Sequence, residues 1–362
     1  MIDRGAPACR GAFFVAASIG GFGLPASCDD LAIFTFRSRP VQGMKIVAGD
    51  IGGTHARFAL AELGPDQPPV ISGMQRYRTR DHDSLASAWA AFARDCGGTL
   101  PRAAALGIAA PIEGEVLRFV NSGWEISRPT VARELGLDRL LLLNDFGAVA
   151  NAIPALPAGA LEHLCGPRVE LPAEGITTVI GPGTGLGVSI LIRRGGQIEV
   201  VETEAAHMPF APQLPEEASL ERAVRERYGR CSIERIVSGP GLLEIYAHLG
   251  GGAGDVLDPG ALWSEAADGG NPLAGRALDL LVGCFGAAAG DISLAHGSMA
   301  VVVTGGLANR MKARLQGSLF QERFVAKGRY RGRMERVPVF LANHAEPGLL
   351  GAAVAFQREL AG

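Results

Sequence analysis

Three glycine-rich segments could place backbone N–H groups around a phosphate. They span residues 50–54 (Asp-Ile-Gly-Gly-Thr), 181–187 (Gly-Pro-Gly-Thr-Gly-Leu-Gly) and 304–306 (Thr-Gly-Gly), and each follows an apolar run. Glycine has no Cβ, so a phosphate can approach its N–H group closely. A structural turn without a ligand explains any one of the three. Three in this order predict a nucleotide held in a cleft between two domains.

The first segment also carries a carboxylate, Asp50, ahead of Gly52, Gly53 and Thr54. A carboxylate at that position suits Mg2+, held mainly through its water shell. The segment is not a Walker loop, because no Gly-Lys-Ser/Thr follows at the required spacing. It is not a dinucleotide-binding fingerprint either, because a strand-like run follows where that motif needs a helix. A plain hairpin turn is the alternative interpretation.

A second carboxylate, Asp145, follows Asn144 directly after the fully apolar residues 140–143. Ligands of open α/β sheets commonly bind where such a strand ends. A carboxylate at that point can accept the proton of a hydroxyl group as the hydroxyl attacks a phosphoryl group. The alternative is that the Asn-Asp pair only caps a helix beginning after Phe146.

The remaining polar candidates are Glu204, His207 and Glu234. A sugar presents adjacent hydroxyl groups that both donate and accept hydrogen bonds, and carboxylate and imidazole groups can hold them in a fixed geometry. The Glu-x-x-His spacing also describes two neighbours on an exposed helical turn, or half of a metal site.

The elements that would position these residues alternate between strands and helices. From Met44 the pattern predicts strands near residues 45–48, 58–61, 104–110, 116–120, 140–143, 177–180, 188–192, 301–303 and 337–341, and helices at 84–94, from 148, at 272–296 and at 348–360. This alternation predicts an α/β architecture with partly parallel sheets. A strand, a Gly-Thr turn and a strand occur both at Asp50 and at residues 177–192, which indicates two related halves.

The composition limits the class of protein. The 362 residues are 48% hydrophobic and 20% charged, enough for two domains with buried cores. The formal net charge of −3 offers no basic face for nucleic acid and no sign of a membrane-surface protein. The six cysteines are scattered without short pairing, which predicts buried thiols in a reducing compartment. A Pro- and Gly-rich stretch at residues 154–176 marks a candidate domain crossing.

We expect residues 1–43 to form an extension outside the catalytic fold. Residues 11–25 are apolar and Arg4 and Arg10 precede or enter them, a faint secretory signal that Asp3 weakens. The motifs begin six residues after Met44, so Met44 is the start that we expect for the authentic protein. A real signal segment and an ordered arm packed on the rest of the chain are the alternatives.

Taken together, residues 44–360 resemble the bacterial ATP-dependent glucokinases. The motifs that carry the resemblance are Gly-Asp-Ile-Gly-Gly-Thr at 49–54, Ala-Ala-Pro-Ile at 109–112, Asn-Ser-Gly-Trp at 121–124, Asn-Asp-Phe at 144–146, the glycine-rich run at 181–187, Glu-Ala-Ala-His at 204–207, Ile-Glu-Arg-Ile-Val-Ser-Gly-Pro-Gly at 233–241, Thr-Gly-Gly at 304–306 and Pro-Gly-Leu-Leu-Gly at 347–351. The resemblance implies the two-domain actin-like, hexokinase-type fold, with an interdomain cleft that closes on sugar. It implies a small domain of residues 44–153 plus 345–362 and a large domain of residues 154–344.

The resemblance also implies the reaction, transfer of the γ-phosphoryl group of Mg-ATP to the 6-hydroxyl of glucose in the cytoplasm. Asp145 would be the catalytic base. Glucose would be bound by Asn144, Asp145, Glu204, His207, Glu234 and Asn121. The phosphates and Mg2+ would lie at Asp50, Gly52, Gly53, Thr54, Gly183, Thr184 and Gly185, and the adenosine at Gly305 and Gly306. Asp50 would reach Mg2+ through water. The expected partners are glucose and ATP, with no nucleic acid, no membrane and a possible homodimer.

Two departures from the family pattern bear on the sugar. His55 stands where the family usually has Asn, and Ala205 and Ala206 replace a pair of glycines between Glu204 and His207. A kinase for another hexose, or one using another phosphoryl donor such as polyphosphate, is therefore an alternative. A sugar-responsive regulator on the same fold is a further alternative. It is disfavoured because the residues before Met44 show no helix-turn-helix pattern and the zinc cluster of repressor-containing sugar kinases is missing.

Overall fold

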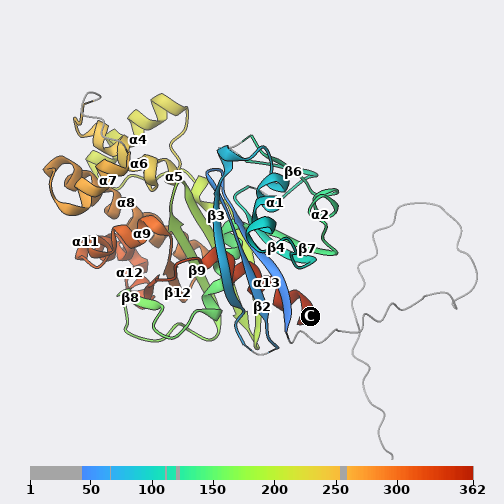
Figure 1. The fold of residues 1–362 in the computed structure, drawn as a ribbon. Coiled ribbons are helices and arrows are strands. Elements are labelled where there is room, and N and C mark those ends of the chain that lie inside the picture. The colour runs from blue at the N-terminus through green and yellow to red at the C-terminus, as the bar shows by residue number, and fades with distance from the viewer. Residues whose placement is uncertain (1–42, 66, 111, 120–122, 253–258, 362) are drawn as a thin grey trace, which may run out of the picture. The chain divides into compact units, whose positions relative to one another are not determined.

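The computed structural model describes residues 43–65, 67–110, 112–119, 123–252 and 259–361. Residues 1–42 of the expected extension lie outside the described part of the chain, as does Asn121. The described residues form one compact unit. That unit contains two large sheets and their helices (Figure 1).

The first large sheet has five strands in the order β3-β2-β1-β4-β7. They are β1 (Met44–Ile51), β2 (His55–Leu63), β3 (Val70–Arg78), β4 (Ala103–Ile108) and β7 (Arg139–Asn144). β1, β2 and β3 pair antiparallel, whereas β1, β4 and β7 pair parallel. The three parallel strands therefore end at one edge of the sheet, and Asp50 and Asn144 both lie at that edge.

Helices pack on both faces of this sheet. On one face, α1 (Leu85–Asp95) places Trp89 and Phe92 against Phe58 of β2, with ring centroids 5.6 and 5.5 Å apart. On the other face, α13 (Pro347–Ala361) buries Leu349, Ala352, Ala353 and Phe356. Small residues dominate the strands at this contact, so the helix lies close to the sheet.

A short two-stranded sheet of β5 (Val116–Arg118) and β6 (Glu125–Ser127) precedes α2 (Val131–Glu134). α3 (Asp145–Ala152) then follows β7 without a loop. The helix that the sequence predicted from Ala148 therefore begins one turn earlier. Asn144 is its N-cap: the Oδ1 atom accepts hydrogen bonds from the N–H groups of Phe146 (2.9 Å) and Gly147 (3.2 Å). An Asn side chain in that position satisfies helix N–H groups that have no partner within the helix.

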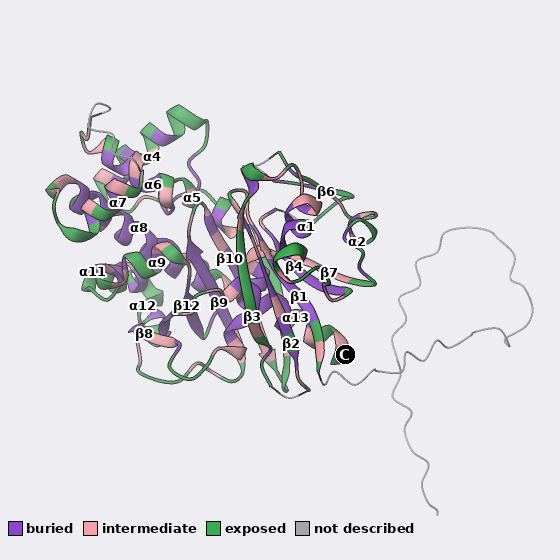
Figure 2. Ribbon diagram, viewed as in Figure 1, coloured by how far each residue is buried: buried purple, intermediate pink, exposed green. Residues whose placement is uncertain are grey.

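The second large sheet repeats part of this plan. Its order is β11-β10-β9-β12-β13-β8. The strands are β8 (Leu161–Cys165), β9 (Gly175–Pro182), β10 (Leu186–Arg194), β11 (Gln197–Thr203), β12 (Ala300–Val303) and β13 (Val339–Ala342). β9, β10 and β11 pair antiparallel, whereas β9, β12 and β13 pair parallel. The recurrence of strand, glycine turn and strand in the sequence thus corresponds to a recurrence in topology. The central strands β9 and β12 are largely buried, whereas the edge strand β3 of the first sheet is exposed (Figure 2).

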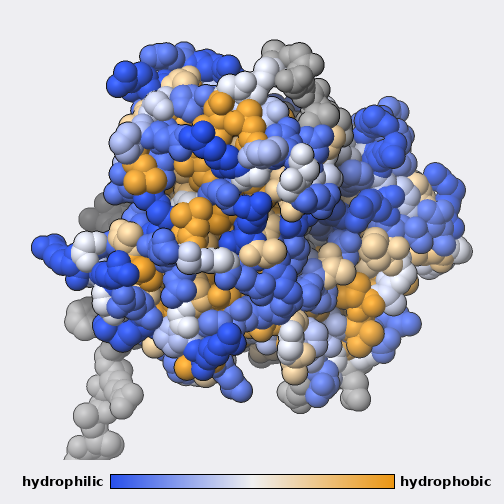
Figure 3. Space-filling model, turned by 90° about the vertical axis from the view of Figure 1, so that its left-hand side faces the viewer, coloured by the Kyte–Doolittle hydropathy of each residue, from blue (hydrophilic) through white to orange (hydrophobic). Residues whose placement is uncertain are grey.

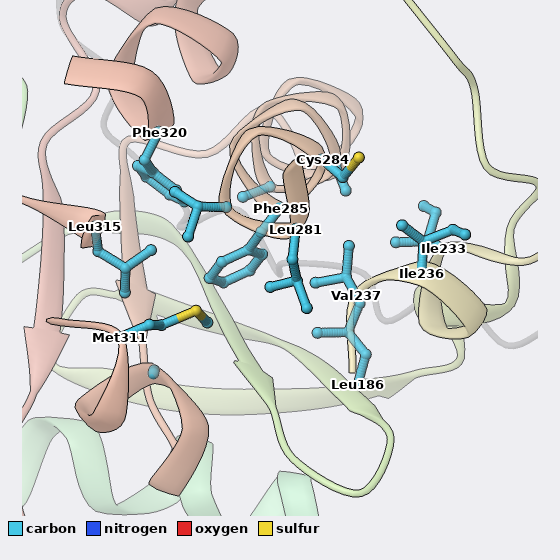
Figure 4. Close-up of a cluster of buried hydrophobic side chains, with 14 of the residues drawn as sticks. Leu186, Ile233, Ile236, Val237, Leu281, Cys284, Phe285, Met311, Leu315 and Phe320 are labelled. Carbon is cyan, nitrogen blue, oxygen red and sulfur yellow. The ribbon is translucent and has the colours of Figure 1, made fainter. Parts of the chain in front are cut away.

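α8 (Pro272–His296) is the central helix beside the second sheet. Asn271 caps its first turn, and Gly297, in the left-handed conformation, ends it. In the described residues it is the one helix with the length and hydropathy of a membrane span, but 83% of that apolar window is buried inside the protein. Phe285 faces the side chains of Met311, Leu315 and Phe320, and Leu281 lies between Phe285 and Val237 (Figure 4). α8 is therefore the core helix of this part of the molecule.

The remaining helices cover α8 and the second sheet: α4 (Pro215–Tyr228), α5 (Ile233–Ile236), α6 (Gly239–His248), α7 (Pro259–Asp268), α9 (Gly306–Arg310), α10 (Lys312–Leu315), α11 (Ser318–Val325) and α12 (Arg331–Met334). On the face in Figure 3, hydrophilic residues predominate and apolar residues form small separate groups. Cys96, Cys165, Cys231 and Cys284, the cysteines within the described residues, are free thiols, and all except Cys96 are buried.

Candidate active site

The first glycine segment forms the tight turn between β1 and β2. Gly52 N–H donates to the carbonyl oxygen of His55 (2.9 Å), and Thr79 holds the turn from outside by bonds to the carbonyl oxygens of Gly53 (2.7 Å) and Thr54 (3.0 Å). Gly53, Thr54 and His55 line a cavity of about 730 Å³, whose other lining residues are Arg78, Thr79, Arg80, His82, Asp83, Gly123 and Trp124. Burial, together with nearby arginines, lowers the pKa of His55.

Asp50 lies beside this turn in an ion-pair chain. Its Oδ2 atom is 2.7 Å from Nη1 of Arg57, and Nε of Arg57 is 3.4 Å from Oε2 of Glu346. Gly348 at the start of α13 approaches so closely that an added Cβ would lie 3.1 Å from Asp50 Cγ. Among the described residues, no cluster of three or more His, Cys, Asp or Glu side chains could hold a metal ion. Asp50 alone offers one carboxylate, already paired with Arg57, and such a donor is compatible with Mg2+ only when the ion is held through water.

Asp145 follows the end of β7 as the first residue of α3. The residue keeps some exposure, but its carboxylate is enclosed, and its Oδ1 atom accepts the N–H of Phe146 (2.8 Å). Burial raises the pKa of Asp145 to about 7, and the negative charges of Asp50, Glu204 and Glu202 contribute to the rise. The Phe146 N–H opposes it, because a hydrogen bond favours the ionised form. A carboxylate with a pKa near neutrality suits general base catalysis.

Residues 183–185 of the second glycine segment form the turn of the hairpin between β9 and β10. Gly183 N–H donates to the carbonyl oxygen of Gly185 (2.7 Å). Glu234, on α5, accepts the N–H of Leu186 (3.0 Å), and an added Cβ at Gly185 would lie 3.1 Å from Glu234 Cδ. Glu234 thus contacts this turn.

The third glycine segment, after β12, lies against the second. Thr304 N–H donates to the carbonyl oxygen of Ile180 (2.9 Å), and an added Cβ at Gly305 would lie 3.0 Å from the carbonyl oxygen of Pro182. Gly305 has a φ of +100°, a conformation that strains other residues. Gly306 is the first residue of α9.

Phe146 of α3 lies between the second glycine segment and Asp145. An added Cβ at Gly181 would lie 2.9 Å from Cζ of Phe146, and one at Gly187 would lie closer still to the ring. The two glycines thus allow the hairpin to pack directly on the residue after Asp145.

His207 is the last residue of a 3-10 turn, Ala205–His207, and Glu204 is the residue before that turn, so the pair does not lie on a regular helix. Nε2 of His207 is 3.6 Å from Oε2 of Glu204, and both side chains are more than half exposed. Ala206, which replaces one of the expected glycines, is 2% exposed and belongs to the hydrophobic core around α8, and Ala205 packs against the same core. The methyl group of Ala206 is therefore packed into the protein interior, and that of Ala205 is partly buried.

The structure brings Asp50 and Glu204 near enough to Asp145 for their negative charges to raise its pKa. Glu202 and Arg57 belong to the same region, and the sequence analysis missed both. Glu202 lies two residues before Glu204, and Arg57 lies three residues after the first glycine turn. Only that proximity in sequence could have drawn attention to them.

The chain is similar to known sugar kinases. The glucokinase family model matches residues 47–359. The glucokinase of Zymomonas mobilis subsp. mobilis is 45% identical over 316 residues, which cover 86% of this chain and 98% of that protein. The crystal structure of a glucokinase from an Antarctic psychrotroph has a TM-score of 0.74 and 29% identity, covering 87% of this chain and 99% of that chain.

A more distant structure shares the fold. The ROK family glucokinase from Streptomyces griseus, in complex with glucose and AMPPNP, has a TM-score of 0.61 and 19% identity, covering 87% of this chain and all of that chain. These likenesses confirm the predicted α/β class and the actin-like sugar kinase fold. The family model spans most of the chain, and the Zymomonas relative is 45% identical over 86% of the chain. The chain therefore belongs to the glucokinase family.

Proposed function

We propose that the chain transfers the γ-phosphoryl group of Mg-ATP to the 6-hydroxyl of glucose, giving glucose 6-phosphate and ADP. The observation that carries the proposal is Asp145, a carboxylate enclosed where a parallel strand ends, with a pKa raised to about 7. Such a group is partly ionised at neutral pH and can accept a proton from an attacking hydroxyl group. The similarity to glucokinases supports glucose as the acceptor.

ATP is the phosphoryl donor in this proposal. The Streptomyces griseus structure contains AMPPNP. In this chain, Gly52, Gly53 and Thr54 would bind the phosphates from one sheet, and Gly183, Thr184 and Gly185 from the other. Gly305 and Gly306 would lie by the adenosine. The N–H groups of Gly52 and Gly183 are used within the turns. Gly53 and Gly185 carry no Cβ that would keep a phosphate away from the backbone, which supports phosphate binding.

Asp50 would hold Mg2+ through water, and the ion would neutralise charge on the phosphates. The chain's own residues position the reactants. The 6-hydroxyl oxygen attacks the γ-phosphorus, the bond from that phosphorus to the bridging oxygen breaks, and ADP leaves. Asp145 takes the hydroxyl proton late in this step. Catalysis then rests mainly on positioning and on electrostatic support.

Asn144, Glu204, His207 and Glu234 would bind the other glucose hydroxyls. Because Glu234 contacts the second glycine turn, we propose that sugar binding and phosphate binding are linked through this residue. The burial of Ala206 in the core, with Ala205 packed against that core, supports retention of glucose as the substrate. Asn121 stays a prediction, because it lies outside the described residues.

The cellular location, the domain boundaries and the oligomeric state of the enzyme are also proposed. Its substrates and products, ATP and hexose phosphates, are handled in the cytoplasm, where we expect it to act. The small domain of residues 44–153 plus 345–362, the large domain of residues 154–344 and the homodimer remain predictions. Light scattering on the purified protein would test the homodimer.

A coupled assay over a panel of hexoses and phosphoryl donors tests the function. We expect glucose with Mg-ATP to give the highest kcat/KM. A preference for mannose, fructose or an N-acetylated sugar would replace the proposed substrate. Turnover with polyphosphate but not with ATP would replace the proposed donor, and no turnover with any pair would refute the proposal.

A further inference from the structure

One carboxylate that is not among the expected site residues connects the two large sheets next to Asp145. Glu202 lies on β11, an edge strand of the six-stranded sheet. Its Oε1 atom accepts the backbone N–H of Asn144 at 2.8 Å. Asn144 is the last residue of β7 in the five-stranded sheet and the N-cap of α3. The contact therefore fixes the backbone immediately before Asp145.

The fit of Glu202 against α3 depends on a glycine. An added Cβ at Gly147 would lie 2.8 Å from Glu202 Cγ and closer still to Oε1. Gly147 is buried and its N–H is bound by the Asn144 side chain. Glu202 thus covers the first turn of α3, where a negative charge also interacts favourably with the helix dipole.

Glu202 also acts on Asp145 through its charge. Its carboxylate raises the pKa of Asp145, together with those of Asp50 on β1 and Glu204 on the following turn. Although Glu202 as a whole residue is open to solvent, partial burial of its carboxylate raises its own pKa, and Glu204 adds to that rise. The hydrogen bond from the Asn144 N–H opposes this rise in the pKa of Glu202, because it favours the ionised carboxylate.

We propose that Glu202 is a positioning residue for phosphoryl transfer: from the opposite sheet it holds in place the junction of β7 and α3 at Asn144 and Asp145. The inference rests on the proposed function, in which Asp145 is the base and Asn144 a sugar ligand. It assigns Glu202 no contact with substrate.

Two substitutions separate the bond from the charge. Glu202→Ala removes both, and we expect a fall in kcat of about tenfold, the size expected for a lost hydrogen bond to a charged group, with a smaller change in KM for ATP. Glu202→Gln keeps an oxygen acceptor, so kcat should fall less. The acid limb of its kcat/KM profile should move to lower pH, because Asp145 loses a neighbouring negative charge. Glu199→Gln, an exposed position on the same strand, is the matched control.

A third substitution reaches the same contact from the other side. Gly147→Ala would push the Glu202 side chain away, because that flexible side chain yields more readily than the backbone. We expect Gly147→Ala to reproduce the loss in Glu202→Ala. The double variant Gly147→Ala/Glu202→Ala should be no worse than either single variant.

Hydrogen exchange gives a readout that is independent of turnover. Peptides covering residues 140–150 should exchange faster in Glu202→Ala than in the wild type or in Glu199→Gln, because the Asn144 N–H loses its acceptor. Unchanged exchange there would overturn the positioning role. In an active enzyme, wild-type kcat in Glu202→Ala, or an unmoved acid limb in Glu202→Gln, would also overturn it. A wild type that phosphorylates no hexose would instead refute the proposed function, and the exchange result would still decide whether Glu202 holds the turn.

Discussion

Replacing Asp145 by Asn is expected to stop turnover and to stabilise the ligand-free protein at neutral pH. The enclosed carboxylate has its pKa raised from 3.8 to about 7. A rise of roughly three pH units corresponds to about 4 kcal/mol, since each unit is worth about 1.4 kcal/mol. The folded protein bears that cost whenever Asp145 is ionised. An Asn side chain has nearly the same shape, can accept the Phe146 N–H and does not ionise.

The sign of the pH dependence follows from proton binding. Between pH 4 and pH 7 the folded state binds a proton at Asp145 that the unfolded state has released, so this group lowers wild-type stability as the pH rises. Above about pH 7 the cost is fully present. The advantage of Asp145→Asn in free energy of unfolding should therefore grow by about 2–3 kcal/mol between pH 5 and pH 8.

Urea unfolding of both proteins at several pH values, without sugar or nucleotide, measures this difference. The same preparations, assayed with glucose and Mg-ATP, should show kcat lowered by about 10²–10⁴-fold in the variant. Asp268→Asn, at the exposed end of α7, is a control that should leave turnover unchanged. A stability advantage that stays constant from pH 5 to pH 8 would refute the burial argument. Near wild-type turnover would refute the assignment of the base.

Three further changes test other parts of the structure. Glucose at 100 times its Kd should add about 2.7 kcal/mol to stability and raise Tm, whereas a non-binding polyol should not, and an unchanged Tm would count against a glucose site. Glu217→Ala should lower the free energy of unfolding in urea by about 3–5 kcal/mol, because it leaves the largely buried Arg323 guanidinium, 2.7 Å from Oε1, without its partner. A loss below about 1 kcal/mol would contradict this. Gly351→Ala should also destabilise, by about 1–3 kcal/mol or more, because a Cβ there would collide with the carbonyl oxygen of Ala148 where α13 packs on α3. A thermal melt equal to that of the wild type would show that the two helices can separate freely.

The sequence by itself determined features that depend on neighbours along the chain. The helix predicted at residues 272–296 has those bounds in the structure, because Pro272 in its first turn and Gly297 at its end are local signals. The three glycine turns and the Asn144 cap could be located for the same reason. β3 and α4 were missed, because the exposed edge strand shows no clear alternation and the helix is polar on most of its surface.

Only the tertiary structure decided how distant segments meet. Nothing in the local pattern indicates that Glu202 binds the Asn144 N–H, that Arg57 joins Asp50 to Glu346, or that Glu234 contacts the second glycine turn. These contacts join residues on different strands and helices, up to 289 positions apart for Arg57 and Glu346. The pKa of Asp145 likewise depends on the tertiary structure. Its value is set by burial and by charges from other elements, which exist only once the chain has folded.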